Sequence, residues 1–270
     1  MSSSFLPYEH SKFHTESYGS GGELLICLHG FGESATHFAV LEQELGKDFT
    51  ILAINMPFHG ETTWREQRDM DKDDLEKLVI KILHDRGKQK FSLLGYSMGG
   101  RLALCIVEKM ADRINKLVLI APDGLKNNPW HLFVTQTRWG NRIFKHTTYH
   151  PAFFFRLLTL TNKLRLINQS VYKFAFHSMD QLQKRELVYM VWTAMRRMMP
   201  QKKKCKTLMA KYHIQTLMLF GKYDRVIPPS LGYGFADGSF PCHIVVLNKG
   251  HQLLSETLGA IIKNNIQTER

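Results

Sequence analysis

Two kinds of hydrophobic pattern alternate along the first half of the chain. Short apolar and β-branched runs predict buried strands, and four of them occur: Glu23–Leu28, Thr50–Ile54, Phe91–Leu94 and Leu117–Ala121. Between them, apolar residues recur at helical spacing in three segments: Thr36–Leu45, Asp73–His84 and Met98–Met110. Strands that alternate with helices are typical of a parallel sheet covered by helices, so the pattern predicts an α/β fold.

The alternation stops in the middle of the chain and resumes near its end. Residues 125–206 mix phenylalanine, leucine, methionine, tryptophan and basic residues in helical order. Two strand runs and one helical run follow: Thr216–Phe220, Ile244–Leu247 and Leu253–Ile262. We therefore expect a mostly parallel central sheet flanked by helices, built from residues 1–124 and 207–270, with a helical cap, or lid, inserted as residues 125–206.

Length and composition fit a folded domain of this kind. The 270 residues can bury a core without disulfides or metal, and 44% hydrophobic with 22% charged residues is the balance of a soluble globular protein. Three of the four cysteines lie inside apolar runs, which predicts buried thiols instead of a disulfide framework. The first residues lack the pattern of a signal peptide, and the apolar run Ala152–Leu160 is shorter than a membrane span of roughly 20 residues, so we expect a cytoplasmic protein.

The net charge of +12 is concentrated in the predicted cap. Residues 125–206 carry 16 Lys and Arg against Asp180 and Glu186, a balance of +14, whereas the other residues carry 20 basic against 22 acidic side chains, a balance of −2. Such a basic surface attracts anionic substrates, an acidic carrier protein or an anionic membrane surface. Nucleic acid is not expected, because no recognition motif accompanies the charge.

The segment Gly95–Gly100 joins a predicted strand to a predicted helix and has the G-x-S-x-G spacing of a nucleophile elbow. A serine on such a tight turn takes strained backbone angles, and glycines beside it avoid collisions. Serine also needs a base and an orienting acid, in the chain order Ser, Asp or Glu, His. Asp224 and His251 each follow a late strand, at the same sheet edge as Ser97, so these three residues form the expected catalytic triad. Asp123 is the alternative acid.

A glycine-rich turn, His29–Gly32, directly follows the first predicted strand. Such a turn can present a backbone amide to a reacting oxygen, and we expect the amides of Phe31 and Met98 to form an oxyanion hole. The 13 histidines do not occur at the spacing of a metal site, and the glycines near residue 20 precede a strand, so neither a metal nor a cofactor is expected.

Together, His29–Gly32, Pro57–Gly60, Gly95–Gly100, the Asp224 loop and the Gly250-His251 pair resemble the α/β-hydrolase family. The resemblance covers about residues 20–124 and 207–265, with phenylalanine at position 58 where the family commonly has glycine. It implies an esterase-like serine hydrolase that forms an acyl-enzyme on the elbow serine. The implied substrates are small-molecule carboxylic esters, thioesters or carrier-linked acyl esters, as for the pimeloyl-carrier-protein methyl esterases of this fold.

Two other functions remain open from the sequence. With Arg101, the elbow resembles that of the menaquinone-pathway lyase of this fold, which uses its serine for proton abstraction and elimination, and a family member without turnover could bind a ligand. Tyr96, Arg101, Trp139 and Trp192 are the candidate substrate contacts. For Arg101 the alternative is a surface residue of the helix, and for the two tryptophans it is that they hold the cap helices together.

Overall fold

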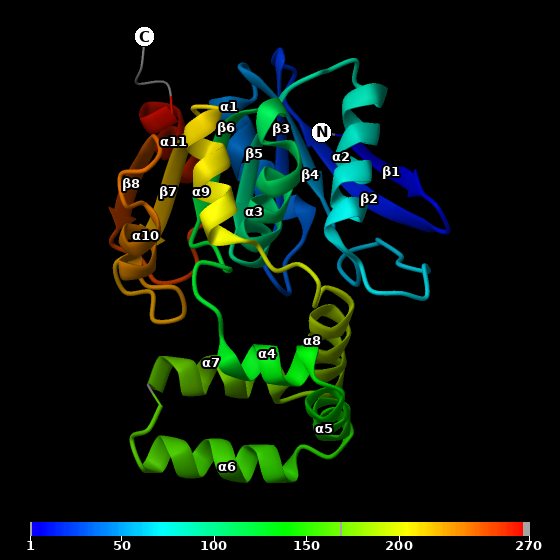
Figure 1. Ribbon diagram of the computed structural model, residues 1–270, viewed down its shortest axis with the longest axis vertical. Coiled ribbons are helices and arrows are strands. Elements are labelled where there is room, and N and C mark those ends of the chain that lie inside the picture. Colours follow the sequence, from blue (N-terminus) through cyan, green and yellow to red (C-terminus); the bar gives the residue numbers. More distant parts are fainter. Residues whose placement is uncertain (1, 168, 267–270) are drawn as a thin grey trace. The chain divides into compact units, whose positions relative to one another are not determined.

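The structure, a computed structural model, describes residues 2–167 and 169–266, which include a sheet of eight strands (Figure 1). The strands are β1 Ser2–Tyr8, β2 Ser11–Tyr18, β3 Glu23–Leu28, β4 Phe49–Ile54, β5 Phe91–Tyr96, β6 Ile114–Ile120, β7 Gln215–Gly221 and β8 Cys242–Leu247. Their order across the sheet is β1-β2-β4-β3-β5-β6-β7-β8. β1 and β2 pair antiparallel, and β3 to β8 are parallel to one another, so the predicted mostly parallel α/β sheet is confirmed.

All six strands predicted from apolar runs are present, with small differences at their ends. The antiparallel strands β1 and β2 were not predicted, because β2 carries polar side chains at buried positions. His14 and Glu16 are both buried, and the His14 ring lies 2.7 Å from Asn55 Nδ2 on one side and 2.7 Å from Ser3 Oγ on the other. Hydrogen bonding allows such groups to be buried, so a search for apolar runs misses this strand.

The connections reverse direction once along the sheet. β3 connects to β4 one way, through the 3-10 helix η1 (Ala35–Leu41) and α1 (Glu42–Leu45), and the later connections between parallel strands run the other way. Because such crossovers are right-handed, η1 and α1 cover one face and the next helices cover the opposite face. Figure 1 shows the latter helices in front of the sheet: α2 (Lys72–Asp85), α3 (Met98–Met110) and α9 (Lys202–Lys211). The reversal lies between β3 and β5, where open α/β sheets bind ligands at the carboxyl ends of the strands.

The helix predictions hold for α2 and α3, whereas two others need correction. The expected helix Thr36–Leu45 is the 3-10 helix η1 followed by the single turn α1. The last helix, α11, spans Leu258–Ile266 and begins later than expected, because the segment before it is held as a loop in which Lys249 Nζ donates to Ser255 Oγ at 2.6 Å. A further short helix, α10 (Pro229–Phe235), was not predicted.

The chain divides into two compact units. The core unit contains the chain up to Gln67, Asp71–Lys126 and the chain from Met198 onward, and the helical unit contains Arg68–Met70 and Asn127–Arg197. The helices of the helical unit are α4 Pro129–Gln136, α5 Arg138–Tyr149, α6 Ala152–Lys163, α7 Gln169–Met179 and α8 Leu182–Ala194. Within the described ranges, no helix is both long and apolar enough to cross a membrane.

The unit boundary differs from the expected insertion of residues 125–206. α9 groups with the core unit, because its Cys205 is buried and donates its thiol hydrogen bond to the carbonyl of Leu104 in α3, at 3.4 Å. The lysine-rich residues 202–206 therefore belong to the core unit. In the other direction, three residues of the loop between β4 and α2 group with the helical unit.

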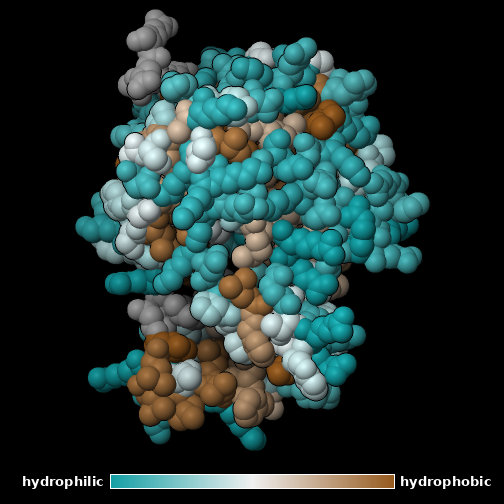
Figure 2. Space-filling view, in the orientation of Figure 1, coloured by the Kyte–Doolittle hydropathy of each residue, from teal (hydrophilic) through white to brown (hydrophobic). Residues whose placement is uncertain are grey.

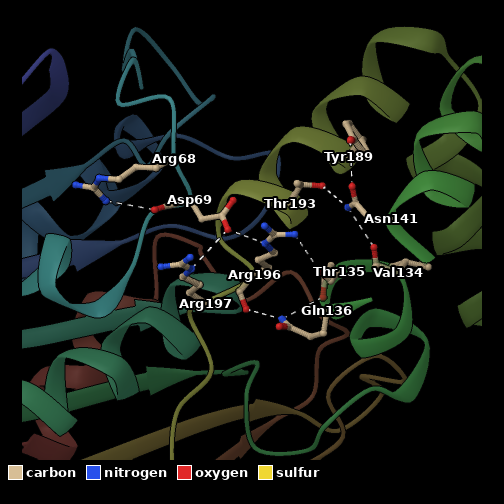
Figure 3. A network of polar contacts seen from close by, with 10 residues as sticks. All are labelled: Arg68, Asp69, Val134, Thr135, Gln136, Asn141, Tyr189, Thr193, Arg196 and Arg197. Atoms are coloured by element: carbon tan, nitrogen blue, oxygen red, sulfur yellow. Dashed lines mark hydrogen bonds and ion pairs between the residues drawn. The ribbon is translucent and has the colours of Figure 1, made fainter. Parts of the chain in front are cut away.

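These three residues, Arg68–Met70, are held within the helical unit by polar contacts (Figure 3). The Asp69 carboxylate accepts a hydrogen bond from Arg196 Nε at 2.6 Å and lies 3.5 Å from Arg197 Nε. The Met70 amide donates to the Ala194 carbonyl at 2.8 Å. The network continues through Gln136 Nε2, which donates to the Arg196 carbonyl at 2.7 Å. One carboxylate thus ties a loop segment to the end of α8.

We expect Asp69→Ala to loosen this segment without unfolding the helical unit. The loss of a partly exposed, charge-assisted contact costs about 1 kcal/mol of local stability, which corresponds to roughly fivefold faster exchange of the Met70 amide hydrogen. Hydrogen exchange read by NMR or mass spectrometry measures this. The control is Lys184→Gln, which removes the exposed ion pair between Lys184 and Asp180 of the same unit and should leave Met70 exchange unchanged. Equal exchange in wild type and Asp69→Ala would contradict the prediction.

Candidate active site

Ser97 occupies the turn between the end of β5 and the start of α3. Its backbone angles, φ 49° and ψ −114°, lie in a region that side-chain-bearing residues rarely adopt. Backbone hydrogen bonds hold the turn. The Ser97 amide donates to the Ile120 carbonyl at 2.9 Å, and the Ser97 carbonyl accepts from the amides of Gly100 and Asp123, both at 2.9 Å. The surrounding backbone therefore imposes the strained conformation, as in a nucleophile elbow.

The glycines of the motif are required by close backbone approaches. A Cβ atom at Gly99 would overlap the Leu28 carbonyl oxygen of β3, and one at Gly95 would overlap the Gly99 carbonyl oxygen. The first helical turn therefore lies directly against the neighbouring strand. This contact explains why glycine stands on both sides of the serine.

Ser97, His251 and Asp224 form a continuous hydrogen-bonded series within the core unit. The Nε2 atom of His251 lies 3.1 Å from Ser97 Oγ, and its Nδ1 atom lies 2.7 Å from Asp224 Oδ2. The second Asp224 oxygen accepts from the amides of Val226 and Ile227, at 2.8 and 2.9 Å. The Asp224 side chain is fully buried, so its carboxylate is fixed by hydrogen bonds on both oxygens.

The alternative acid, Asp123, is engaged elsewhere. One of its carboxylate oxygens lies 3.5 Å from Arg101 Nε, and the other accepts from the Gly124 amide at 2.7 Å. The structure therefore brings Asp224, and not Asp123, to the imidazole. Three side chains that are distant in sequence meet at the carboxyl edge of the parallel strands, as predicted from their positions after β5, β7 and β8.

The loops that follow β3 and β5 meet where the strand order reverses, and they carry the two expected oxyanion amides. Met98 is the first residue of α3, where amides have no partner inside the helix and the helix dipole favours negative charge. Phe31 lies in the loop after β3, whose conformation is held by a hydrogen bond from the Gly32 amide to His59 Nε2 at 3.0 Å. Among the contacts found for the described residues, neither the Phe31 nor the Met98 amide donates to another group. Their role in oxyanion binding stays a prediction.

Two neutral histidines shape the Phe31 loop. His29 is fully buried, its Nε2 accepts from the Met56 amide at 3.0 Å, and its Nδ1 lies 2.7 Å from the Gly30 carbonyl, to which it donates. Burial, with a smaller contribution from the nearby His59, lowers the pKa of His29 from 6.5 to about 3. Burial also lowers the pKa of His59. In each ring, Nε2 accepts a hydrogen bond from a backbone amide, which requires that this nitrogen carry no proton. Both rings must therefore stay neutral.

The candidate substrate contacts in the core unit need correction. Tyr96 is buried, and its hydroxyl donates to the His251 carbonyl at 3.0 Å. This hydrogen bond helps to hold the loop that carries His251. Burial raises the Tyr96 pKa well above its ordinary value, so the hydroxyl keeps its proton. Arg101 is buried as well, beside Asp123, so the alternative of a surface helix residue is wrong. Both side chains therefore position other groups and do not face open space.

The two tryptophan candidates lie in the helical unit. Trp192 packs its ring against His131 and Phe144, with centroids 4.8 and 5.6 Å apart, which fits the alternative that it holds helices together. Trp139 is exposed on α5. For both residues, contact with substrate remains a prediction.

Glu33 was not among the residues predicted for the site, and it lies in the loop after β3, next to Gly32. Burial raises the pKa of its carboxyl group, and the nearby His37, His251 and Gln252 partly offset this rise. Its position directly after the glycine-rich turn was the one sequence signal that could have placed it near the site. Its charge and its distance along the chain did not predict that it lies near His251. Among the described residues, no group of three or more His, Cys, Asp and Glu is arranged to hold a metal ion.

Comparisons with known proteins agree with this geometry. A family model for the alpha/beta hydrolase fold matches residues 23–256. The uncharacterized hydrolase YugF of Bacillus subtilis is 24% identical over 78% of this chain and 77% of that protein. A pimeloyl-[acyl-carrier protein] methyl ester esterase of Nitrosomonas europaea is 27% identical over 41% of each chain. Several curated relatives are matched over less than half of their own length.

A solved structure extends the likeness to the whole chain. MGS-M2, an alpha/beta hydrolase from a deep-sea metagenome library of the Medee basin, matches with a TM-score of 0.69 and 18% identity. The match covers 99% of this chain and 98% of that chain. At this identity the likeness shows the fold alone.

We expect acid to destabilise the folded chain through His29. The unfolded chain binds a proton at this residue below about pH 6.5, whereas the folded chain does so only near pH 3. Stability is therefore lost as the pH falls through this window, by about 2 kcal/mol between pH 6.5 and 5 for one such group.

His29→Gln removes this titration, so its free energy of unfolding should fall less steeply with acid than that of wild type. Urea unfolding at several pH values measures the difference. His213→Gln, at an exposed position after α9, is the control. Its free energy of unfolding should depend on pH as steeply as that of wild type. Parallel curves for wild type and His29→Gln would refute the assignment.

Proposed function

Because the chain belongs to the α/β-hydrolase fold family, we propose that it is a carboxylic-ester hydrolase with Ser97 as its nucleophile. The observation that carries the proposal is the unbroken series of hydrogen bonds from Asp224 through His251 to Ser97. Serine is a weak nucleophile until a base takes its proton, and this arrangement supplies both the base and the acid that orients it.

The proposed reaction has two halves. His251 Nε2 takes the proton of Ser97 Oγ as this oxygen attacks the ester carbonyl, and Asp224 stabilises the resulting imidazolium. The Phe31 and Met98 amides hold the negative oxygen of the tetrahedral intermediate, which collapses as His251 gives its proton to the leaving alcohol. Water, deprotonated by His251, then attacks the acyl-enzyme, and His251 returns the proton to Ser97 Oγ as the acid is released.

The proposed substrates are small to medium acyl esters, including thioesters and esters attached to a carrier. The Nitrosomonas europaea relative is named as a methyl ester esterase for a carrier-linked acyl group, and this supports the class. The helical unit carries 12 basic and 3 acidic side chains, a formal charge of +9, so it attracts negatively charged molecules.

The environment of Arg101 argues against the lyase alternative. That chemistry needs arginines to hold substrate carboxylates, whereas Arg101 is buried beside the carboxylate of Asp123. The strained turn at Ser97 argues against a purely binding role, because strain of this kind is stored where a reacting group must be presented.

We expect Ser97→Ala to abolish turnover of a p-nitrophenyl ester and labelling by a fluorophosphonate. Asp224→Asn should lower kcat by about 10⁴-fold, because the imidazole loses the partner that fixes its tautomer. Stopped-flow release of nitrophenol should show a burst in the wild type, as expected for an acyl-enzyme.

Asp123→Asn is the matched control, since it changes a nearby carboxylate that does not contact His251. It should keep kcat near the wild-type value. Activity that survives Ser97→Ala, or a larger loss in Asp123→Asn than in Asp224→Asn, would overturn the proposed mechanism.

A further inference from the structure

Large hydrophobic side chains are exposed mainly on the helical unit. Of the twenty such residues found exposed among the described side chains, thirteen lie in this unit, although it is the smaller of the two. They are Trp130, Phe133, Trp139, Ile143, Tyr149, Phe153, Leu157, Leu160, Leu164, Leu166, Phe176, Leu182 and Met190. Figure 2 shows hydrophobic side chains gathered over α6, with hydrophilic side chains projecting at the margins. Contiguous apolar surface of this kind marks an interaction site.

Helix α6 presents an apolar stripe on the face that a water-exposed helix usually makes polar. Phe153, Leu157 and Leu160 share one face of α6, and Leu164, which caps the C-terminus of the helix, continues the row. Their exposed fractions are 76%, 47%, 51% and 58%, respectively. The opposite face packs on α7, where the rings of Phe155 and Phe176 are 5.1 Å apart. The exposed stripe is therefore additional to the face that the fold uses.

Cations flank the stripe. Arg156 and Lys163, one helical repeat of seven residues apart, lie beside it on α6 and are exposed. On α5, the Arg142 guanidinium lies 5.6 Å from the ring centroid of the exposed Trp139. Long basic side chains next to apolar ones can extend their charges outward while the stems cover hydrophobic surface.

We propose that the α6 stripe, defined as Phe153, Leu157, Leu160 and Leu164, docks the helical unit on an anionic lipid bilayer. The four apolar side chains enter the boundary between headgroups and acyl chains, and Arg156 and Lys163 contact the lipid phosphates. The formal charge of +9 on the unit is complementary to such a surface. This proposal does not depend on the chemistry at Ser97.

Charge distinguishes the bilayer from a second copy of the chain. Two stripes packed together would bring two units of charge +9 into contact, and their repulsion opposes association, whereas an anionic bilayer neutralises the same charge. An acidic protein would match the charge, yet it would not require four apolar side chains in one row. The combination of cations and an exposed apolar stripe favours the lipid surface.

Vesicle binding of the full-length chain tests the proposal. Sedimentation with vesicles of phosphatidylcholine mixed in equal parts with phosphatidylglycerol should carry down the wild type, and vesicles of phosphatidylcholine alone should bind it much less. Added salt should weaken the binding. Ser97→Ala should bind as wild type, which separates docking from catalysis.

Two double variants separate the apolar and charged contributions. Phe153→Ser with Leu160→Ser should weaken binding at least about tenfold, since each side chain loses most of its burial in lipid. Arg156→Gln with Lys163→Gln should weaken it about 25-fold, because each cation near an anionic surface strengthens adsorption about fivefold. All four positions are exposed, so the variants should keep their helices, which circular dichroism measures.

The matched control lies on α2 of the core unit, where the exposed Ile80 stands between Lys77 and Lys81. Ile80→Ser, and Lys77→Gln with Lys81→Gln, should leave vesicle binding unchanged. Three results would overturn the proposal. These are no vesicle binding by the wild type, an equal loss of vesicle binding in the α2 control variants, or unchanged vesicle binding in Phe153→Ser with Leu160→Ser. If the wild type instead forms a dimer and does not bind vesicles, and Phe153→Ser with Leu160→Ser converts the dimer to a monomer, the stripe binds a second copy of the chain.

Discussion

The strained turn at Ser97 depends on the parallel sheet behind it. A serine with φ 49° is unfavourable in an isolated peptide, and it persists because β6 accepts its amide while the following loop donates to its carbonyl. The same sheet reverses its strand order between β3 and β5, so the loop that carries Phe31 meets the turn that carries Ser97. A nucleophile and its base therefore converge at this edge of the sheet, beside the loop and the helix start that carry the two amides predicted to form the oxyanion hole.

Two neutral histidines hold the loop that lies next to the turn at Ser97. His29 and His59 each accept a backbone amide, and through Gly32 and Met56 they hold the glycine-rich loop next to the elbow. Burial keeps both rings uncharged, because a buried cation would lack solvation and could not accept these bonds. The loop that presents Phe31 is thus built on two histidines whose lowered pKa values keep them neutral in mild acid.

The helical unit and the core unit differ in where their apolar residues lie and in their net charge. The core unit buries most of its apolar residues between the sheet and the helices, whereas the helical unit exposes a row of them on α6 and carries +9 of the net charge of +12. A core with little excess charge suits a rigid scaffold for a small reacting centre. A basic, partly apolar surface attracts negatively charged molecules more strongly than the nearly neutral core unit does.

The sequence by itself determined the α/β sheet, the elbow around Ser97 and the positions of Asp224 and His251 after late strands, because apolar runs, glycine spacing and chain order are local signals. Only the tertiary structure decided that His251 contacts Asp224 and not Asp123, and that Tyr96 supports the histidine loop from a buried position. It also revealed the polar strand β2 and the exposed face of α6. These features depend on packing between segments far apart in the chain, and the hydrophobic pattern of one segment does not specify its neighbours.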